Sequence, residues 1–340
     1  MAGNKAGMKI IIATIAVVTV LLLVFLLFLK NTFTPRGQDK FNKVKFLLDW
    51  KAGPEFIGYI VAKDKQFYLQ EGIDVELIEG TGAVDSAKLV AAGTYGLGVS
   101  SAAAVLEARA QRAPLFALAV IFQKSPVVIL SIKENNIVRP SDLKGKRIGV
   151  HYGSSEYLEY RAMMNALNIP LLSVQEVGIG FDVQALLSGQ IDAQTGYTQN
   201  APNQVRLAGR EVNQIFVEDW GVKIYSSLII ANGTFLATNN ELARKIVRAS
   251  LRGWQYSLDH TEEAIKVVLN NYPILDEKFV RACTRDTLGL IKRRDVGKHS
   301  LGHQEIERWR NLREIMLAQG VIKDPIEIEA FVTMEYLPGR

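Results

Sequence analysis

The side chains best suited to contact a small molecule stand where short apolar runs end. Asp49 and Trp50 close an apolar run of strand length that begins at Val44, and Phe56 and Tyr59 follow in a helical pattern. A tryptophan there could stack on a flat ring, with dispersion and quadrupole terms worth about 0.5–1.5 kcal/mol beyond burial. We therefore expect Asp49, Trp50, Phe56 and Tyr59 to contact a ligand. The alternative is a core tryptophan that closes a lobe.

A second polar cluster, residues 151–157, lies between an expected strand and an expected helix. Gly153 and the serines after it would present backbone N–H groups at the helix N-terminus, which binds anions or carbonyl oxygens. A glutamate in this turn could accept a hydrogen bond from a ligand amine. The residues predicted to bind a ligand here are Tyr152, Ser154, Ser155 and Glu156. The alternative is an ordinary helix cap, with Ser154 bonded to the backbone.

Two segments, 89–101 and 186–197, repeat one pattern: a helix end, a glycine, a short strand and then small or polar residues. In open α/β sheets, ligands bind outside the carboxyl ends of the strands. One such unit in each lobe would therefore face the other across a cleft. The same pattern recurs in α/β proteins generally, so a purely structural interpretation stays open. The residues that this pattern and the polar segment after it add to the predicted site are Ser100, Ser101, Tyr197 and Asn200.

Signatures of catalysis, cofactors or metals are weak. Neither the P-loop pattern nor Gly-x-Gly-x-x-Gly after a strand is present. The chain has four histidines, and two of them, His299 and His303, straddle Gly302, which is a poor helix interior. The single cysteine, Cys283, allows neither an internal disulfide nor a Cys-x-x-Cys motif. We therefore expect a binding protein with no catalytic residues, no metal and no cofactor.

From residue 44 to residue 230, apolar runs of strand length alternate with helical patterns, which indicates an α/β fold. A new series of strands and helices opens near residue 141, and from Thr238 onward the pattern contains helices alone. Thr238 and Glu241 have capping-box spacing, which predicts the start of a long amphipathic helix. Trp254 and Trp309 have apolar neighbours at helical spacing, so we expect both in the core. The predicted architecture is two α/β lobes with a cleft between them, lobe 1 comprising residues 44–130 and 231–340 and lobe 2 residues 131–230.

Residues 10–29 form a stretch without charge that is long enough to span a bilayer as one helix. A cleaved signal peptide is the alternative, but its apolar stretch usually has about 7–15 residues and ends at a small-x-small site. No such site follows this stretch, and no nearby cysteine offers a point for lipid attachment. Lys5 and Lys9 precede the span and predict a cytoplasmic N-terminus at 1–9. A linker at 30–43 then leads to an extracytoplasmic domain.

The formal charge of +5 is concentrated near the N-terminus. Residues 1–40 hold five Lys or Arg and one Asp, so the other 300 residues carry only +1. Because the body of the chain has no excess of basic residues, nucleic-acid binding loses its main support.

Several motifs resemble the periplasmic substrate-binding proteins related to thiamine-pyrimidine-precursor binders, which are close to sulfonate and taurine binders. The resemblance covers about residues 44–290. The matching motifs are LDW at 48–50, GYIVA at 58–62, FYxxEGIDV at 67–75, LKGKRIG at 143–149, LLSGQID at 186–192 and RASLRGW at 248–254. The family implies a type II periplasmic-binding-protein-like fold, in which two lobes joined by two crossings close on a ligand for an ABC permease. By motif position, Trp50, the turn 153–156 and the segment 196–200 would line the cleft.

The chain also departs from this family. Its members often have the pattern Asp-Trp-x-Pro-Asn-x-x-His-x-Gly, whereas Ala52, Gly53 and Phe56 stand at the Pro, Asn and His positions here. Eukaryotic relatives that make the thiamine pyrimidine use that histidine and a cysteine-rich iron-binding motif, and this sequence has neither. A pyrimidine-synthase type of enzyme is therefore not expected.

These features together predict the extracytoplasmic solute-binding component of an ABC uptake transporter. A single span would anchor it in the inner membrane, with the binding domain on the periplasmic side. Its partners would be a small ligand, a thiamine pyrimidine precursor or a similar heterocycle, and the ABC permease. We expect a monomer that binds no nucleic acid. The alternative is a membrane-anchored sensor that uses the same two lobes to regulate a membrane partner.

Overall fold

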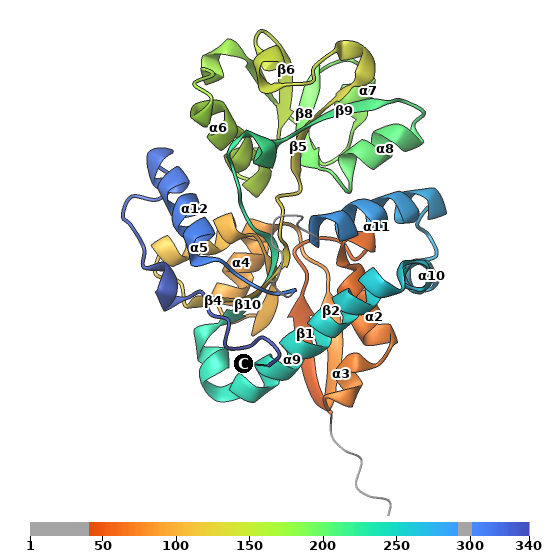
Figure 1. Cartoon of the computed structure of the whole chain (residues 1–340), viewed down its shortest axis with the longest axis vertical. Helices are drawn as coiled ribbons and strands as arrows, with labels where there is room; N and C mark the ends of the chain where they lie inside the picture. Colours follow the sequence, from red (N-terminus) through yellow and green to blue (C-terminus); the bar gives the residue numbers. More distant parts are fainter. Residues whose placement is uncertain (1–40, 292–300, 340) are drawn as a thin grey trace, which may run out of the picture. The chain divides into compact units, whose positions relative to one another are not determined.

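The computed structural model describes residues 41–291 and 301–339. The chain divides into Met1–Asn42 and a second compact unit, Lys43–Arg340, which contains two five-stranded sheets (Figure 1). The expected membrane span at 10–29 lies outside the described residues. Every helix within the described residues is too short or too polar to span a bilayer.

The first sheet has the strand order β2-β1-β3-β10-β4. Strands β1 and β3 are parallel, whereas β10 is antiparallel to both of its neighbours. Its strands are β1 (Asn42–Leu47), β2 (Ile73–Ile78), β3 (Leu97–Ser100), β4 (Leu115–Phe122) and β10 (Ser226–Asn232). The helices around it are η1 (Pro54–Phe56), α2 (Ile57–Asp64), α3 (Phe67–Gln70), α4 (Ala83–Ala91), α5 (Ala102–Ala110), α9 (Gly233–Asp259), α10 (Thr261–Asn271), α11 (Glu277–Ile291), α12 (Ile306–Ala318) and η6 (Ile328–Ala330). We call this part, the described residues of 43–122 and 226–339, lobe 1.

The second sheet has the strand order β7-β6-β8-β5-β9. Strand β6 is parallel to β7 and β8, and β5 is antiparallel to β8 and β9. Its strands are β5 (Val127–Ile132), β6 (Arg147–Val150), β7 (Gln175–Gly178), β8 (Ala193–Tyr197) and β9 (Val212–Phe216). The helices here are η2 (Lys133–Asn135), η3 (Pro140–Leu143), α6 (Ser155–Ala166), η4 (Leu171–Ser173), α7 (Gln184–Leu187) and α8 (Ala201–Leu207). We call this part, residues 127–216, lobe 2; it occupies the upper part of Figure 1.

Two short segments connect the lobes. Residues 123–126 lead from β4 to β5, and residues 217–225, which include η5 (Val217–Trp220), lead from β9 back to β10. Both crossings therefore begin several residues before the boundaries expected after 130 and 230. Strands β4 and β5 are almost wholly buried. Because a buried strand carries no alternation between polar and apolar residues, the sequence pattern does not reveal which sheet it joins.

Helix α9 begins at Gly233, five residues before the start predicted at Thr238. The Oδ1 atom of Asn232 accepts hydrogen bonds from the backbone N–H groups of Thr234 (2.8 Å) and Phe235 (3.3 Å) and caps the helix. Because Thr238 already lies within a helical turn, its hydroxyl donates back to the Thr234 carbonyl instead of capping. The helix is nevertheless kinked one residue later, where Asn239 has non-helical dihedral angles.

Helices α2 and α9 cross at two glycines. A Cβ atom at Gly58 would lie 2.1 Å from the Trp254 ring, and one at Gly253 would lie 2.1 Å from the Gly58 carbonyl oxygen. Only glycine at both positions lets the backbones approach this closely. Tyr59 packs edge-on against Trp254, with ring centroids 5.4 Å apart. Trp254 and Trp309 are fully buried, which confirms their predicted place in the core.

Within the described residues no strand follows α9, and the C-terminal helices belong to lobe 1, although α11 also packs on α8 of lobe 2. The segments around Gly302 and Val332 form isolated bridges with β4. The Arg308 guanidinium of α12 donates to the carbonyl oxygens of Gln123 (2.7 Å) and Ile224 (3.4 Å), one in each crossing. A single side chain of α12, Arg308, therefore contacts both crossings.

Candidate ligand-binding cleft

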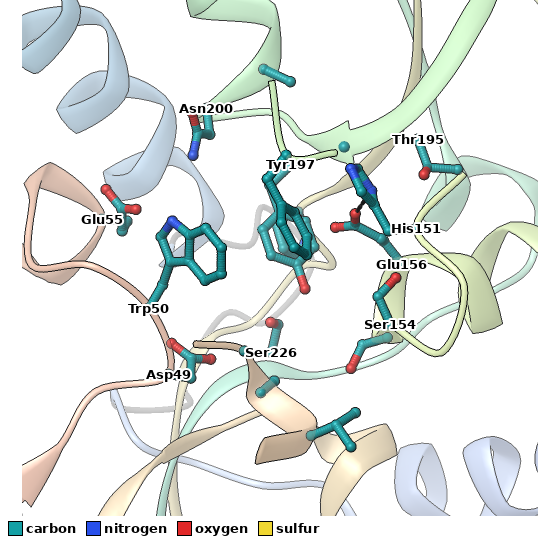
Figure 2. Close-up of a pocket in the computed structure, with 18 of the residues that line it drawn as sticks. Asp49, Trp50, Glu55, His151, Ser154, Glu156, Thr195, Tyr197, Asn200 and Ser226 are labelled. Atoms are coloured by element: carbon teal, nitrogen blue, oxygen red, sulfur yellow. Dashed lines mark ion pairs between the residues drawn. The ribbon is translucent and has the colours of Figure 1, made fainter. Parts of the chain in front are cut away.

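A cavity of about 420 Å³ lies between the two lobes. Loops at the carboxyl ends of β1, β6 and β8 and the first residues of β10 contribute its walls (Figure 2). In Figure 2 the rings of Trp50 and Tyr197 approach the centre of the cavity from opposite lobes. The placement follows the rule that ligands sit outside the carboxyl ends of strands in open α/β sheets.

The wall from lobe 1 begins with Asp49 and Trp50, directly after β1. The Gly80 N–H donates to the Trp50 carbonyl oxygen (3.2 Å), which holds this loop against the turn that follows β2. A Cβ atom at Gly80 would lie 2.2 Å from the Leu48 carbonyl oxygen, so the approach requires glycine. The Glu79 carboxylate accepts from the Ala52 N–H (3.0 Å) and fixes the loop farther along. The chain thereby presents Trp50 to the cleft from a backbone that is restrained on two sides.

Two carboxyl groups, Asp49 and Glu55, line this wall. Burial raises the pKa of Asp49 to about 6. Burial, together with the charge of Asp49, raises the pKa of Glu55 to about 7. The thiol of Cys283, on α11, lies 4.0 Å from the Glu55 carboxylate. Both carboxyl groups are therefore poorly solvated and bind their protons at a higher pH than ordinary carboxyl groups do.

The wall from lobe 2 contains the turn between β6 and α6. Gly153 has a φ of +79°, which allows the tight turn, and Ser154 caps α6 by accepting from the Tyr157 N–H (3.2 Å). The predicted cap by Ser154 is therefore present, although the residue also lines the cavity. The carboxylate of Glu156 pairs with Nδ1 of His151, as the dashed line in Figure 2 marks. One oxygen of the predicted ligand acceptor is thus already engaged.

Phe181 closes this side of the cleft from the loop between β7 and α7. Its ring stacks face to face on His151, with centroids 4.4 Å apart and planes 9° apart. It also contacts Trp50 of the other lobe, with centroids 4.8 Å apart and a 59° tilt. Aromatic side chains from both lobes therefore meet at the cleft.

Nine of the twelve predicted binding residues line the cavity, and their role in binding stays a prediction. They are Asp49, Trp50, Phe56, Tyr152, Ser154, Ser155, Glu156, Tyr197 and Asn200. They come together because β1, β6 and β8 all end at this edge of their sheets.

The other three predicted residues lie away from the cavity wall. Tyr59 is fully buried in the core of lobe 1, because it points to the face of α2 that packs on α9. The Ser100 hydroxyl donates to the Ala83 carbonyl oxygen (2.8 Å). The Ser101 hydroxyl caps α5 and hydrogen-bonds the Ser155 hydroxyl of lobe 2 (2.7 Å), so it joins the lobes instead of facing the cavity.

Several lining residues were not predicted from the sequence. Glu55 and His151 stand beside predicted residues, and their position next to a strand end could have indicated them. Ser226 and Ser227 begin β10, which is antiparallel, so its amino end lies at the edge where the parallel strands finish. Ser227 has a left-handed φ of 50°, an uncommon backbone conformation for a non-glycine residue. Phe181 follows Gly180 in a loop, and no periodic pattern indicated it.

The lining is aromatic and acidic with little positive charge. Lys88 is the single Lys or Arg among the described residues that line the cavity. Within the described residues, no group of His, Cys, Asp and Glu side chains is arranged to hold a metal ion. The arrangement suits a flat ring that carries hydrogen-bond donors or a positive charge.

Comparisons with known proteins agree with this architecture. Riboflavin-binding protein RibY of Chloroflexus aurantiacus is 27% identical to this chain, and the match covers 90% of this chain and 89% of RibY. The formylaminopyrimidine-binding protein of Halalkalibacterium halodurans is 23% identical, with 92% and 96% covered. A 4-amino-5-hydroxymethyl-2-methylpyrimidine phosphate synthase of Candida albicans is 26% identical over 66% of this chain and 69% of its own length.

Among solved structures, the periplasmic aliphatic sulphonate binding protein SsuA of Escherichia coli superposes with a TM-score of 0.69. It is 14% identical, and the match covers 85% of this chain and 97% of that chain. The two sheets therefore form a type II periplasmic-binding-protein fold. The sequence pattern of the NMT1/THI5 like family matches residues 53–264, which is more than half of the chain. This protein belongs to the NMT1/THI5 like family.

Proposed function

We propose that this protein is the extracytoplasmic solute-binding component of an ABC uptake transporter, and that it binds a flat, neutral or cationic heterocycle by lobe closure. The cleft lined by Trp50, Tyr197 and Phe181 beside the carboxyl groups of Asp49 and Glu55 is the observation that carries this proposal. Aromatic faces select flat rings, and carboxyl groups accept hydrogen bonds from ring N–H or amino groups.

The composition of the cleft argues against a sulfonate as the ligand, although the fold is shared with a sulfonate binder. A bound anion needs a positive charge or several N–H donors to replace its hydration. Lys88 is the single Lys or Arg beside four lining carboxyl groups, Asp49, Glu55, Asp85 and Glu156, in the described part of the cleft. The names of two relatives specify riboflavin and formylaminopyrimidine, both flat nitrogen heterocycles, and this agrees with the lining.

Contacts between the lobes support closure as the mechanism. The Ser101 and Ser155 hydroxyls hydrogen-bond at 2.7 Å, and Asn203 of α8 donates to Asp286 of α11 at 2.8 Å. A ligand that contacts both lobes binds the closed state more tightly than the open one. It shifts the equilibrium towards closure by the difference between these two affinities. The two crossings at 123–126 and 217–225 are the hinge in this mechanism.

The transporter setting is part of the proposal. The apolar stretch 10–29 would anchor the protein in the inner membrane with the two lobes on the periplasmic side, next to an ABC permease. We propose a monomer that hands its ligand to that permease.

A thermal-shift screen of the full chain in mild detergent tests ligand binding. The compounds are riboflavin, 4-amino-5-hydroxymethyl-2-methylpyrimidine, formylaminopyrimidine, taurine and an alkanesulfonate. A ligand bound only by the folded state raises the melting temperature in a saturable way. We expect a rise with a heterocycle and none with the sulfonates. A rise with a sulfonate alone would contradict the proposed ligand class.

Some relatives, among them the protein of Candida albicans, are synthases, so an enzyme is the second candidate. Mass spectrometry of the ligand after incubation with the protein separates the two. Recovery of the ligand unchanged supports binding, and conversion of the ligand into a compound of different mass supports catalysis.

A sensor role is tested in the source organism. Deleting the gene abolishes uptake of the bound compound if the protein serves a transporter and leaves uptake unchanged if the protein is a sensor.

A further inference from the structure

Phe181 has an unusual position for an exposed aromatic residue. Its side chain is 60% exposed, yet its ring contacts His151 of its own lobe and Trp50 of the other lobe. An apolar ring with this exposure is normally mobile, because few neighbours restrict it. The face-to-face stack on His151 therefore decides where the Phe181 ring lies.

Both ring nitrogens of His151 face hydrogen-bond acceptors. Nε2 lies 2.9 Å from the Gly180 carbonyl oxygen, which can only accept, so Nε2 donates. Nδ1 pairs with the carboxylate of Glu156. With Nε2 donating, a proton held on Nδ1 beside this carboxylate makes the ring the charged imidazolium. The charged ring then lies flat against Phe181, where a cation is attracted to the aromatic face.

The surroundings favour this charge. Burial opposes it, but the hydrogen bond and charge of Glu156, the Gly180 carbonyl oxygen and the charge of Asp182 outweigh burial and raise the pKa of His151. His151 and Glu156 are 7% and 5% exposed, so solvent screens this pair weakly. His151 also holds the loop backbone through the carbonyl of Gly180, the residue just before Phe181. Two contacts thus fix Phe181, one to its ring and one to its backbone.

We propose that Phe181 is a specificity-determining residue of the cleft: positioned by His151 and Glu156, it reaches Trp50 from the opposite lobe and completes the aromatic wall that retains flat ligands in the closed state. This inference rests on the proposed function and adds to it. His151 acts through Phe181 and is a positioning residue.

The first measurement needs no ligand. Spin labels are attached to Leu172→Cys in lobe 2 and Ile274→Cys in lobe 1, two fully exposed positions, in the full chain; native Cys283 is buried. Pulsed electron paramagnetic resonance then reports the distance between the lobes. We expect Phe181→Ala to shift the distribution to longer distances and Phe181→Tyr, which keeps the ring, to restore it. An unchanged distribution in Phe181→Ala overturns the proposal, even if no ligand has been found.

The second measurement uses riboflavin as the probe. We expect Phe181→Ala and Phe181→Leu to weaken its binding by about three- to tenfold, because leucine restores apolar volume but not the aromatic face. Phe181→Tyr should bind as the natural protein does. Tighter binding by Phe181→Ala would overturn the proposal, because Phe181 would then occupy the place of the ligand. If no variant binds riboflavin while the distances still shift, the ligand class is wrong and the role of Phe181 in closure stands.

The role of His151 is tested by its dependence on Phe181. We expect His151→Gln and Glu156→Gln each to lengthen the distance between the lobes in the natural background and to have little effect when combined with Phe181→Ala. The closed fraction of the natural protein should fall as pH rises through the raised pKa of His151, whereas His151→Gln should leave only the dependence that comes from Asp49 and Glu55 on the facing wall. Additive effects in the double variants would overturn the assignment of His151 as a positioning residue.

Discussion

Asn203 of α8 donates a hydrogen bond of 2.8 Å to the carboxylate of Asp286 on α11, and this contact joins lobe 2 to lobe 1. Asn203 is buried, and its other contacts hold it in place: it donates to the Gln199 carbonyl oxygen and accepts from Arg206. Helix α11 also packs on η1, which carries Glu55. The contact therefore connects closure of the lobes with the acidic wall of the cleft.

Removing the acceptor should favour the open state. We expect Asp286→Ala to weaken riboflavin binding by about three- to tenfold, in line with a net hydrogen-bond contribution of about 0.5–1.5 kcal/mol. Isothermal titration calorimetry measures the change. Arg285→Ala, an exposed position on the same helix, is the matched control and should bind normally. Equal losses in both variants would mean that the hydrogen bond does not contribute to closure.

Trp50 should contribute more to binding than any other single side chain of lobe 1. Trp50→Ala removes an aromatic face and its buried area, so we expect riboflavin binding to fall by about 10- to 100-fold. Trp50→Phe keeps a ring and should recover much of the affinity. Thermal unfolding checks that both variants fold. Unchanged affinity in Trp50→Ala would remove this residue from the site.

The raised pKa values of Asp49, about 6, and Glu55, about 7, predict how stability depends on pH. Each carboxyl binds its proton more tightly in the folded than in the unfolded chain. The stability that this provides is full below the ordinary pKa values of 3.8 and 4.5 and is lost as pH rises through about 6 and 7.

Replacing these carboxyls with amides should remove that loss. We expect Asp49→Asn and Glu55→Gln each to raise the free energy of unfolding at pH 8 by about 1–2 kcal/mol, with little effect at pH 4. Urea unfolding at the two pH values measures it. Asp85→Asn, a lining residue in the first turn of α4, serves as the control. A gain that is equal at pH 4 and pH 8 would contradict the assigned pKa values.

Glu159, beside the first crossing, makes a second pH-dependent contribution to the stability of the fold. Burial raises its pKa to about 8, and its carboxyl group hydrogen-bonds the Ser125 hydroxyl (2.5 Å) in the first crossing. Its proton stabilises the fold fully below pH 4.5, and this contribution is lost as pH rises through about 8. We therefore expect Glu159→Gln to raise the melting temperature at pH 9 and to leave it nearly unchanged at pH 5. Differential scanning calorimetry at both pH values decides the matter; a lower melting temperature at pH 9 would contradict the prediction.

The alternation of strand and helix patterns was enough to predict the α/β class and the strand ends that form the cleft. It did not determine which face of a helix points inward. Tyr59 stands three residues after Phe56, yet Phe56 lines the cavity and Tyr59 packs on Trp254. That difference depends on how α2 crosses α9, a long-range contact that spacing within one segment does not encode.

Contacts across the cleft were also beyond prediction from the sequence. Ser101 was expected to bind a ligand, but it hydrogen-bonds Ser155, 54 residues away in the other lobe. Phe181 follows two glycines at 178 and 180, in a loop without periodicity. Its role becomes visible only when His151 and Trp50 are placed beside it. A short polar or aromatic side chain can cap a helix, pack in the core or contact a ligand. Its role depends on the tertiary contacts that the fold gives it.

Arg308 should stabilise the protein through both crossings. Its guanidinium donates to the carbonyl oxygens of Gln123 and Ile224 and lies 4.0 Å from the centre of the Tyr225 ring. Arg308→Met leaves two buried carbonyl oxygens without this donor, so we expect a loss of about 2–4 kcal/mol in the free energy of unfolding. Arg308→Lys should recover only part of it, because an ammonium group lacks the planar fork.

The control lies on the same helix. Arg310 forms exposed ion pairs with Glu307 and Glu329, and such pairs contribute little, so Arg310→Met should cost less than about 1 kcal/mol. Urea unfolding gives both values, and the distance between spin labels at 172 and 274 reports the hinge. If Arg308 restrains the crossings, Arg308→Met should also broaden that distance distribution, whereas Arg310→Met should not. A stability loss with an unchanged distribution would assign Arg308 to the core packing of α12 alone.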